Sequence, residues 1–225
     1  MDQHTRRLLA IVCRNPDVGS VKTRLIPALG EEGARSLYRA FLQDLGARFA
    51  DREYDLLWSY TPEGGPLDPV PASGRMYPQE GPDLGRRLLR IFERAVGDGY
   101  DRVVVISSDV PHLPVELVEA AFEGLCGCDV VLAPSEDGGY HLVGMSSTHD
   151  IFTMVPMSTP AVFAQTREIL TERGLSLQIL SLDFDIDLPE DLPRLADRLA
   201  QDAALSQGHT AHALRGQPAR SLMDE

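Results

Sequence analysis

The chain has 225 residues, of which 43% are hydrophobic and 24% charged, and its formal net charge is −13 at pH 7. That length supports one sizeable core, and an acidic chain lacks the clustered Lys and Arg that nucleic-acid binding requires. No apolar run approaches membrane-spanning length, and the N-terminus lacks the pattern of a signal peptide. A cytoplasmic enzyme or binding protein is therefore expected, without nucleic acid or an integral membrane segment as partner.

Strand-like and helix-like segments alternate along the chain. Seven segments have the apolar or alternating pattern of strands: residues 7–13, 54–60, 75–78, 103–109, 129–133, 138–145 and 175–182. Five have the apolar spacing or the end signals of helices: residues 31–50, 84–96, 114–125, 159–173 and 189–204. The alternation predicts a single three-layer α/β/α domain over residues 1–205 with a mainly parallel sheet. Residues 206–225 show no period and are predicted to form a loose C-terminal tail.

One pair of strands breaks the parallel pattern. Residues 138–145 follow residues 129–133 after only a short turn, which is too short for a helical crossover. This segment is expected to pair antiparallel or to lie elsewhere, so the sheet is predicted to be mixed.

Residues 103–109 (VVVISSD) are predicted to form the buried central strand. The run is apolar on both faces, and Pro111 stops the hydrogen-bond ladder near Asp109. Open α/β sheets bind ligands at the carboxyl ends of their strands, which places Asp109 where such folds do their chemistry. A divalent metal ion would compensate the desolvation of its carboxylate. Capping of the next turn by the same side chain is the alternative.

The loop at residues 14–24 (RNPDVGSVKTR) follows the first strand and carries Lys22 and Arg24. Arginine binds phosphate in a bidentate manner and lysine as a point charge, so this loop suits a di- or triphosphate. The Gly-x4-Gly-Lys pattern of a P-loop is missing, and a solvated charged loop is the alternative. Because the two cations stand two residues apart, an extended segment would point both into the cleft of Asp109.

Two further loops contain candidate binding groups. In residues 77–87 (YPQEGPDLGRR), Gln79 offers a donor and an acceptor for a base edge, although a turn followed by a helix capped by Asp83 explains this segment equally well. In residues 135–141 (SEDGGYH), Asp137 precedes Gly138 and Gly139, which suggests a backbone pressed against a ligand. A tight turn between strands is the simpler interpretation there, because Asp-Gly is a turn signal.

Residues 183–192 (DFDIDLPEDL) contain Asp183, Asp185 and Asp187 in alternation, so the three share one face of an extended segment. Carboxylates this close repel one another unless they cap, pair or bind a cation. Mg²⁺ prefers oxygen ligands and typically takes one or two carboxylates together with substrate phosphate. Capping of the following helix by Asp187 is the alternative.

Five segments in this order resemble a known bacterial family: RNPDVGSVKTRL, PDLGRRL, VVVISSDVPHL, APSEDGGYHLVGM and DIDLPEDL. The chain is similar, over roughly residues 8–199, to the glycosyltransferase-like DUF2064 group of the nucleotide-diphospho-sugar transferase superfamily, which has the GT-A fold. It also resembles, more distantly, the 2-phospholactate guanylyltransferases. The resemblance implies a GT-A-like domain that binds a nucleotide or nucleotide-sugar with Mg²⁺ or Mn²⁺ and an unidentified small-molecule acceptor.

The resemblance also implies roles for individual residues, which we treat as expectations. They are metal ligation by Asp109 and Asp187, phosphate binding by Arg14, Lys22 and Arg24, base recognition by Gln79, and an acceptor-side loop with Asp137 as candidate base beside Gly138 and Gly139.

Three departures from the superfamily patterns bear on the reaction. The Leu-x-Gly-Gly start of sugar nucleotidyltransferases is absent, Ser107 stands where an Asp-x-Asp motif would have its first Asp, and Leu188 replaces the usual Thr after Asp187. Family resemblance favours glycosyl transfer from a nucleotide-diphospho-sugar, with Asp109 and Asp137 as the catalytic residues. Nucleotidyl transfer with release of pyrophosphate and a non-catalytic nucleotide-binding regulator are the alternatives.

Overall fold

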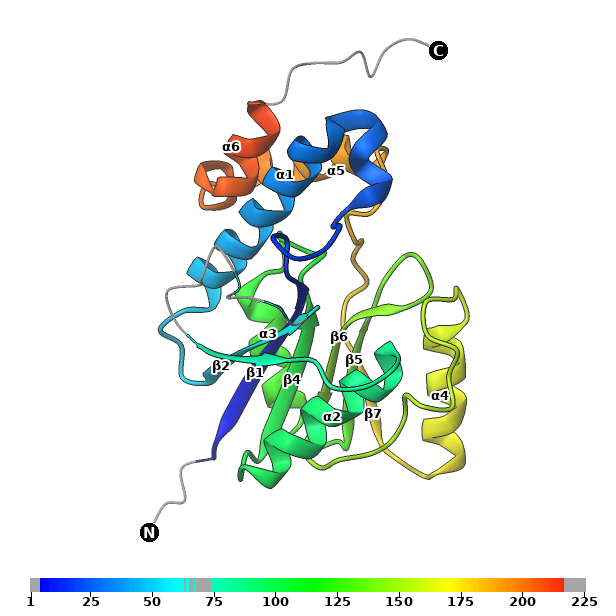
Figure 1. Cartoon of the computed structure of the whole chain (residues 1–225). Coiled ribbons are helices and arrows are strands. Elements are labelled where there is room, and N and C mark those ends of the chain that lie inside the picture. Colours follow the sequence, from blue (N-terminus) through cyan, green and yellow to red (C-terminus); the bar gives the residue numbers. More distant parts are fainter. Residues whose placement is uncertain (1–4, 63, 65–66, 68–73, 217–225) are drawn as a thin grey trace.

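The computed structural model describes residues 5–62, 64, 67 and 74–216. Its strands form one sheet in the order β3-β2-β1-β4-β6-β5-β7 (Figure 1). The strands are β1 (Arg7–Arg14), β2 (Asp55–Thr61), β3 (Arg75–Pro78), β4 (Arg102–Ser107), β5 (Val130–Pro134), β6 (Tyr140–Met145) and β7 (Leu177–Ile179).

The sheet is mixed, as the sequence predicts. β1 pairs in parallel with β2 and with the central strand β4, whereas β6 runs antiparallel to both β4 and β5. The turn that joins β5 to β6 explains the reversal, because so few residues cannot return the chain to the other end of the sheet. All strands except β6 therefore end at one edge, which we call the carboxyl edge.

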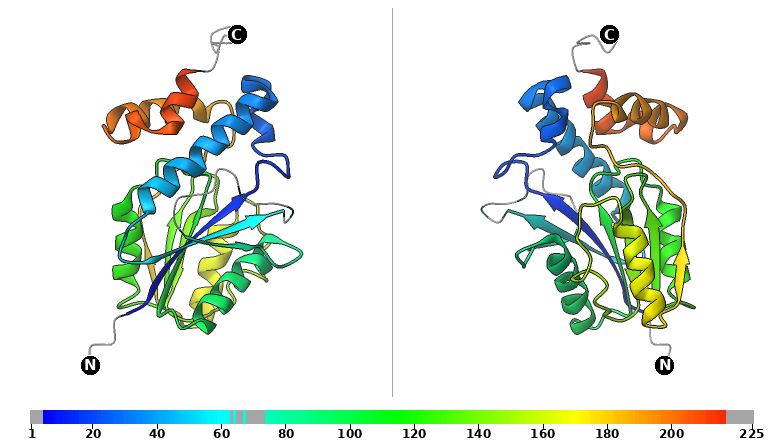
Figure 2. Two further views of the ribbon diagram at one scale, coloured as in Figure 1. Left: turned by 60° about the vertical axis from the view of Figure 1, so that its left-hand side comes forward. Right: turned by 90° about the vertical axis from the view of Figure 1, so that its right-hand side faces the viewer.

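Helices cover both faces of the sheet and complete three layers (Figure 2). The helices are α1 (Ile26–Phe49), α2 (Leu84–Gly97), α3 (Val115–Gly124), α4 (Val162–Glu172), α5 (Asp191–Gln201) and α6 (His209–Arg215). Of these, α5 and α6 lie beyond the carboxyl edge of the sheet, beside α1 (Figure 1). Alternate residues of β1 enter different cores: Leu9 and Ile11 pack with α1 and α3, and Leu8 and Ala10 pack with α2. Both faces of β1 are buried, which is why its sequence is a continuous apolar run.

The first helix begins earlier than predicted and is broken. α1 starts at Ile26, with Pro27 in its first turn, and Gly30 interrupts it with φ 72° and ψ 167°. A residue with a side chain rarely adopts that φ, so glycine allows the chain to turn there. The predicted start at residue 31 corresponds to the longer part of α1 beyond this break.

The predicted loose tail is wrong for residues 206–215. A short 3₁₀ turn (Leu205–Gln207) leads into α6, which packs beside α1. The carboxylate of Asp44 on α1 accepts hydrogen bonds from the backbone N–H groups of His209 (2.7 Å) and Thr210 (2.8 Å), so a side chain distant in sequence caps α6. Residues 217–225 of the predicted tail lie outside the described residues.

No helix in the described part of the chain has both the length and the apolar character that crossing a bilayer would require.

Candidate functional site

The two predicted metal ligands, Asp109 and Asp187, meet at the carboxyl edge. Asp109 lies two residues beyond β4, and Asp187 lies on the extended segment that leads to α5. The backbone N–H of Ile186 donates a 2.9 Å hydrogen bond to the carbonyl of Asp109, which fixes this segment beside the end of the central strand. The tertiary fold thus places both aspartates where the sequence predicts them.

The side chain of Lys22 lies between the two carboxylates. Its Nζ is 2.6 Å from Oδ1 of Asp109 and 2.9 Å from Oδ1 of Asp187, and it also donates to the carbonyl of Ile186 at 2.6 Å. Burial by itself lowers the pKa of Lys22, but the two carboxylates outweigh burial and raise the pKa above its usual value. Lys22 is therefore charged and neutralises part of this acidic site.

The donor set also fits a divalent ion. The described residues contain no group of three or more His, Cys, Asp and Glu side chains that could hold a metal by themselves. Mg²⁺ does not need such a group, since it commonly takes one or two carboxylates and fills its other positions with water and substrate phosphate. Asp109 and Asp187 provide these two carboxylates, and the position of Lys22 shows that they can share one cation.

Asp185 belongs to the same acidic group but does not contact Lys22. Its Oδ2 accepts a hydrogen bond from the hydroxyl of Ser135. Burial raises the pKa of Asp185 to about 7; the bond from Ser135 opposes this shift, and the carboxylates of Asp109, Asp137 and Asp187 add to it. Asp185 is therefore only partly ionised near neutral pH, and a cation bound at this site would favour its charged form.

The sequence prediction did not single out His112, which is buried and contacts Asp183 next to the acidic group. Nε2 of His112 lies 3.1 Å from Oδ1 of Asp183, which also accepts from Arg198 at 3.3 Å. His141 is buried nearby, and burial lowers its pKa to about 4 despite the opposing carboxylate of Asp183. The missed signal was the presence of two histidines in apolar surroundings, each within a segment already singled out for its aspartates.

Arg14 and Arg24 are exposed at the same edge. Neither forms an ion pair with any described residue. The predicted extended segment is wrong, because residues Thr23–Leu25 form a 3₁₀ turn and Lys22 before it adopts left-handed backbone angles. Lys22 consequently points at Asp109, while Arg24 stays in solvent with its guanidinium available to a ligand.

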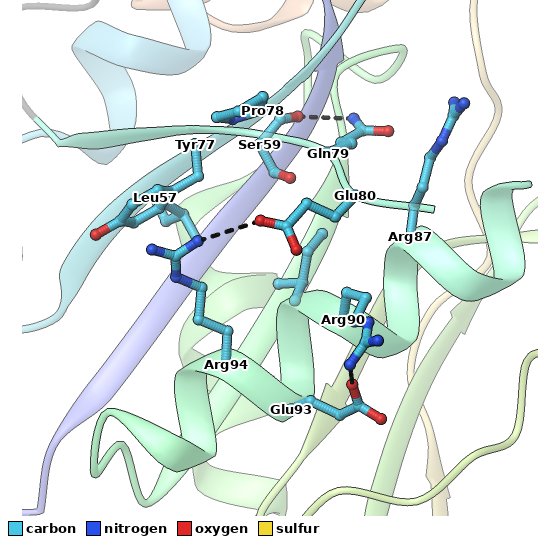
Figure 3. Close-up of a pocket in the computed structure, with 11 residues that line it drawn as sticks. Leu57, Ser59, Tyr77, Pro78, Gln79, Glu80, Arg87, Arg90, Glu93 and Arg94 are labelled. Atoms are coloured by element: carbon cyan, nitrogen blue, oxygen red, sulfur yellow. Dashed lines mark hydrogen bonds and ion pairs between the residues drawn. The ribbon is translucent and has the colours of Figure 1, made fainter. Parts of the chain in front are cut away.

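Gln79 lies at one end of a cavity of about 380 Å³ between β2, β3 and α2 (Figure 3). Its Nε2 donates to the carbonyl of Cys13 (3.2 Å) and to that of Ser59 (2.8 Å). These bonds fasten the end of β3 to β1 and β2, and the amide oxygen of Gln79 accepts no hydrogen bond from the described residues. The predicted role in base recognition therefore stays a prediction that depends on this oxygen.

An ion pair and a cation–π contact join residues that line this cavity. The guanidinium of Arg94 stacks on the ring of Tyr77, 3.7 Å from its centroid, and lies 3.7 Å from the carboxylate of Glu80 (Figure 3). Arg87 donates to the carbonyl of Gly81 and extends away from Arg94. The charged groups are thus spread around the rim and do not converge on one point.

The loop that contains Gly138 and Gly139 is a tight turn, and it packs closely against the loop that contains Pro160. Gly138 has φ +90°, and a Cβ there would lie 2.1 Å from the carbonyl oxygen of Pro160. Glycine is therefore required by close packing between two loops. The side chain of Asp137 accepts from the N–H of Gly139 at 2.9 Å, which stabilises the turn. Their roles toward an acceptor stay predictions, because the turn alone accounts for this arrangement.

Comparison with known proteins defines the family. Residues 36–159 match a family described as uncharacterized proteins conserved in bacteria (DUF2064). A solved structure from Desulfovibrio desulfuricans G20 is 31% identical, with a TM-score of 0.87 over 94% of this chain and 95% of that chain. The chain belongs to the DUF2064 family. The Desulfovibrio protein carries a provisional description as a nucleotide-diphospho-sugar transferase, and this superfamily fold agrees with the mixed sheet described above.

Two curated relatives of this DUF2064 protein are guanylyltransferases. The phosphoenolpyruvate guanylyltransferase of Sphaerobacter thermophilus is 26% identical over 200 residues, which cover 86% of this chain and 95% of that protein. The 2-phospho-L-lactate guanylyltransferase of Methanothermobacter thermautotrophicus is 26% identical over 176 residues, 76% of each chain. A 4-diphosphocytidyl-2C-methyl-D-erythritol synthase shares the fold at a TM-score of 0.56 and 11% identity. The DUF2064 protein is accordingly a transferase with a nucleotidyltransferase-like fold.

Proposed function

We propose that this DUF2064 protein is a metal-dependent nucleotidyltransferase, which transfers a nucleoside monophosphate from a nucleoside triphosphate to the phosphate group of a small acceptor. The observation that carries the proposal is that the carboxylates of Asp109 and Asp187 lie together at the carboxyl edge, where both contact the ammonium group of Lys22. The sequence favours glycosyl transfer by resemblance. We now prefer nucleotidyl transfer, because both curated relatives named above are guanylyltransferases.

The proposed reaction exchanges one P–O bond for another. An oxygen of the acceptor phosphate attacks the α-phosphorus, the bond from that phosphorus to the bridging oxygen breaks, and pyrophosphate leaves with the electron pair. Arg14 and Arg24, exposed at this edge, would bind the triphosphate and the departing pyrophosphate. A bound Mg²⁺ held by Asp109 and Asp187 would neutralise charge that develops on the phosphate oxygens.

A phosphate acceptor does not require a general base, because its oxygens are already ionised near neutral pH. An alcohol acceptor, as in glycosyl transfer, would need a group to remove its proton. Asp137 is the predicted candidate for that role. The two reactions therefore differ in whether Asp137 is needed.

Release of pyrophosphate tests the proposal. The protein is incubated with Mg²⁺, each of the four ribonucleoside triphosphates, and either phosphoenolpyruvate or 2-phospholactate as acceptor. We expect acceptor-dependent pyrophosphate with one triphosphate, loss of the activity in Asp109→Asn, and its retention in Asp137→Asn. No pyrophosphate with any pair of substrates would contradict transfer to these two acceptors.

Glycosyl transfer is the second candidate, favoured by the description of the 31% identical Desulfovibrio structure. A screen of nucleotide-diphospho-sugars for release of nucleoside diphosphate tests it. Release that requires Asp137 as well as Asp109, without any pyrophosphate from triphosphates, would support this second reaction in place of the first.

A further inference from the structure

Lys22 is the only lysine in the chain, and its ammonium group is fully occupied. The group has three N–H donors and no acceptor. Its three partners are Oδ1 of Asp109, Oδ1 of Asp187 and the carbonyl of Ile186, all within 2.9 Å. No donor remains for a phosphate, so in this arrangement Lys22 cannot play the phosphate-binding role that the sequence predicts.

The lysine and the two carboxylates face solvent very differently. The side chain of Lys22 is 5% exposed, whereas the side chains of Asp109 and Asp187 are 36% and 45% exposed. Lys22 therefore holds the carboxylates from the interior, and a cation can approach both of them from solvent. A divalent ion bound by the same two oxygens would repel the ammonium group at this short range.

The backbone conformation of Lys22 is unfavourable, which is consistent with movement of its side chain when a ligand binds. Its φ of 48° and ψ of 42° are left-handed, a conformation that is unfavourable for a residue with a long side chain. Such conformations persist where surrounding contacts hold them, and here the contacts include the two ion pairs and the hydrogen bond to the carbonyl of Ile186. Loss of the ion pairs would leave the residue free to return to a favoured region.

We propose that Lys22 is an exchangeable internal cation. Without ligand it balances part of the negative charge of Asp109 and Asp187. A divalent ion that binds these carboxylates displaces its ammonium group, which then becomes available to the phosphates of the nucleotide. Only the choice of a nucleotide as the phosphate ligand rests on the proposed function. Displacement of the lysine by a metal ion does not depend on which group is transferred.

Titration with Mn²⁺ in the absence of nucleotide tests the displacement. Lys22→Met removes the competing charge and keeps most of the side-chain volume, so we expect it to bind Mn²⁺ at least tenfold more tightly than the parent protein. Lys22→Arg is the matched control, because it retains a competing cation and is expected to bind weakly like the parent. Unchanged affinity in Lys22→Met, or an equal gain in Lys22→Arg, would overturn the proposal.

A second measurement uses the unaltered protein, in case Lys22→Met does not fold. Because the chain has a single lysine, a small acetylating reagent reports on Lys22 directly by mass spectrometry, with a lysine peptide in the same solution as internal standard. We expect Mn²⁺ to accelerate acetylation of Lys22 several-fold, and an equimolar mixture of the four ribonucleoside triphosphates to slow it again. A rate that Mn²⁺ leaves unchanged would overturn the displacement, and a rate unaffected by triphosphates would overturn the phosphate contact.

Neither measurement includes group transfer. If Lys22 exchanges with Mn²⁺ but no pyrophosphate is released, only the proposed function is rejected. If pyrophosphate is released but Lys22 stays protected with Mn²⁺, only the exchange is rejected.

Discussion

Nε2 of His112 lies 3.1 Å from Oδ1 of Asp183, and this contact joins the two segments that carry Asp109 and Asp187. His112 follows Asp109 by three residues, and Asp183 precedes Asp187 by four. The imidazole also packs on the ring of Phe184, with centroids 4.6 Å apart. The positions of the two site carboxylates therefore depend on a buried polar contact behind them.

We expect His112→Ala to lower the free energy of unfolding by about 2–4 kcal/mol, because it removes a buried ring and a partner of Asp183. It should also weaken binding of Mn²⁺ by the carboxylates that this contact positions. Urea unfolding and Mn²⁺ titration measure the two effects. His212→Ala, at an exposed position on α6, is the control and should change neither. Wild-type stability in His112→Ala would show that the contact contributes little.

His141 should make the protein sensitive to mild acid. Burial lowers its pKa to about 4 from the ordinary histidine value of 6.5, so the unfolded chain takes up a proton at this residue before the folded protein does. Neutral His141 therefore adds about 3 kcal/mol to the free energy of unfolding above pH 6.5. This stabilisation is lost as the pH falls toward 4.

The test compares urea unfolding at pH 7 and pH 4.5 in the parent protein and in His141→Phe. We expect the substitution to remove most of the loss of stability between these pH values. His149→Gln, at a half-exposed histidine, is the control and should keep the loss. Equal pH dependence in His141→Phe and the parent would assign the acid sensitivity to other groups.

Asp44 should determine whether α6 stays attached. Its carboxylate accepts two backbone hydrogen bonds at the start of α6, so we expect Asp44→Ala to cost about 1–2 kcal/mol and to release this helix. Limited proteolysis should then cut after residue 201 faster than in the parent. Asp51→Ala, at an exposed residue beyond α1, should leave the rate of cleavage unchanged. Equal cleavage rates in Asp44→Ala and the parent would mean that packing on α1 suffices to hold α6.

Arg24 should contribute to nucleotide affinity through its guanidinium, which pairs with no carboxylate in the described part of the chain. A charge-assisted hydrogen bond contributes about 1.5–3 kcal/mol, so Arg24→Ala is expected to weaken binding of a nucleoside triphosphate by about ten- to a hundredfold. It should also reduce the dependence of affinity on salt. Calorimetric titration at two ionic strengths measures both effects. Arg52→Ala is the matched control, because Arg52 precedes β2 at the opposite edge of the sheet. Equal affinities in the two variants would mean that the loop with Arg24 is a solvated turn that does not bind phosphate.

Local sequence determined most of the secondary structure and the edge on which the site lies. Continuous apolar runs such as residues 103–106 are buried on both faces, and the short turn before β6 makes this strand antiparallel to β5. The carboxyl edge then follows, because parallel strands end together, and it collects Asp109 and Asp187 from distant parts of the chain.

Tertiary structure decided how the charged groups are used. Residue spacing placed Lys22 and Arg24 side by side, but the left-handed backbone of Lys22 turns its side chain inward onto Asp109 and Asp187 while Arg24 remains outside. The cap of α6 by Asp44 and the contact of His112 with Asp183 likewise join residues far apart in sequence. Spacing and periodicity describe neighbours along the chain, whereas these contacts depend on which surfaces meet after the layers have packed.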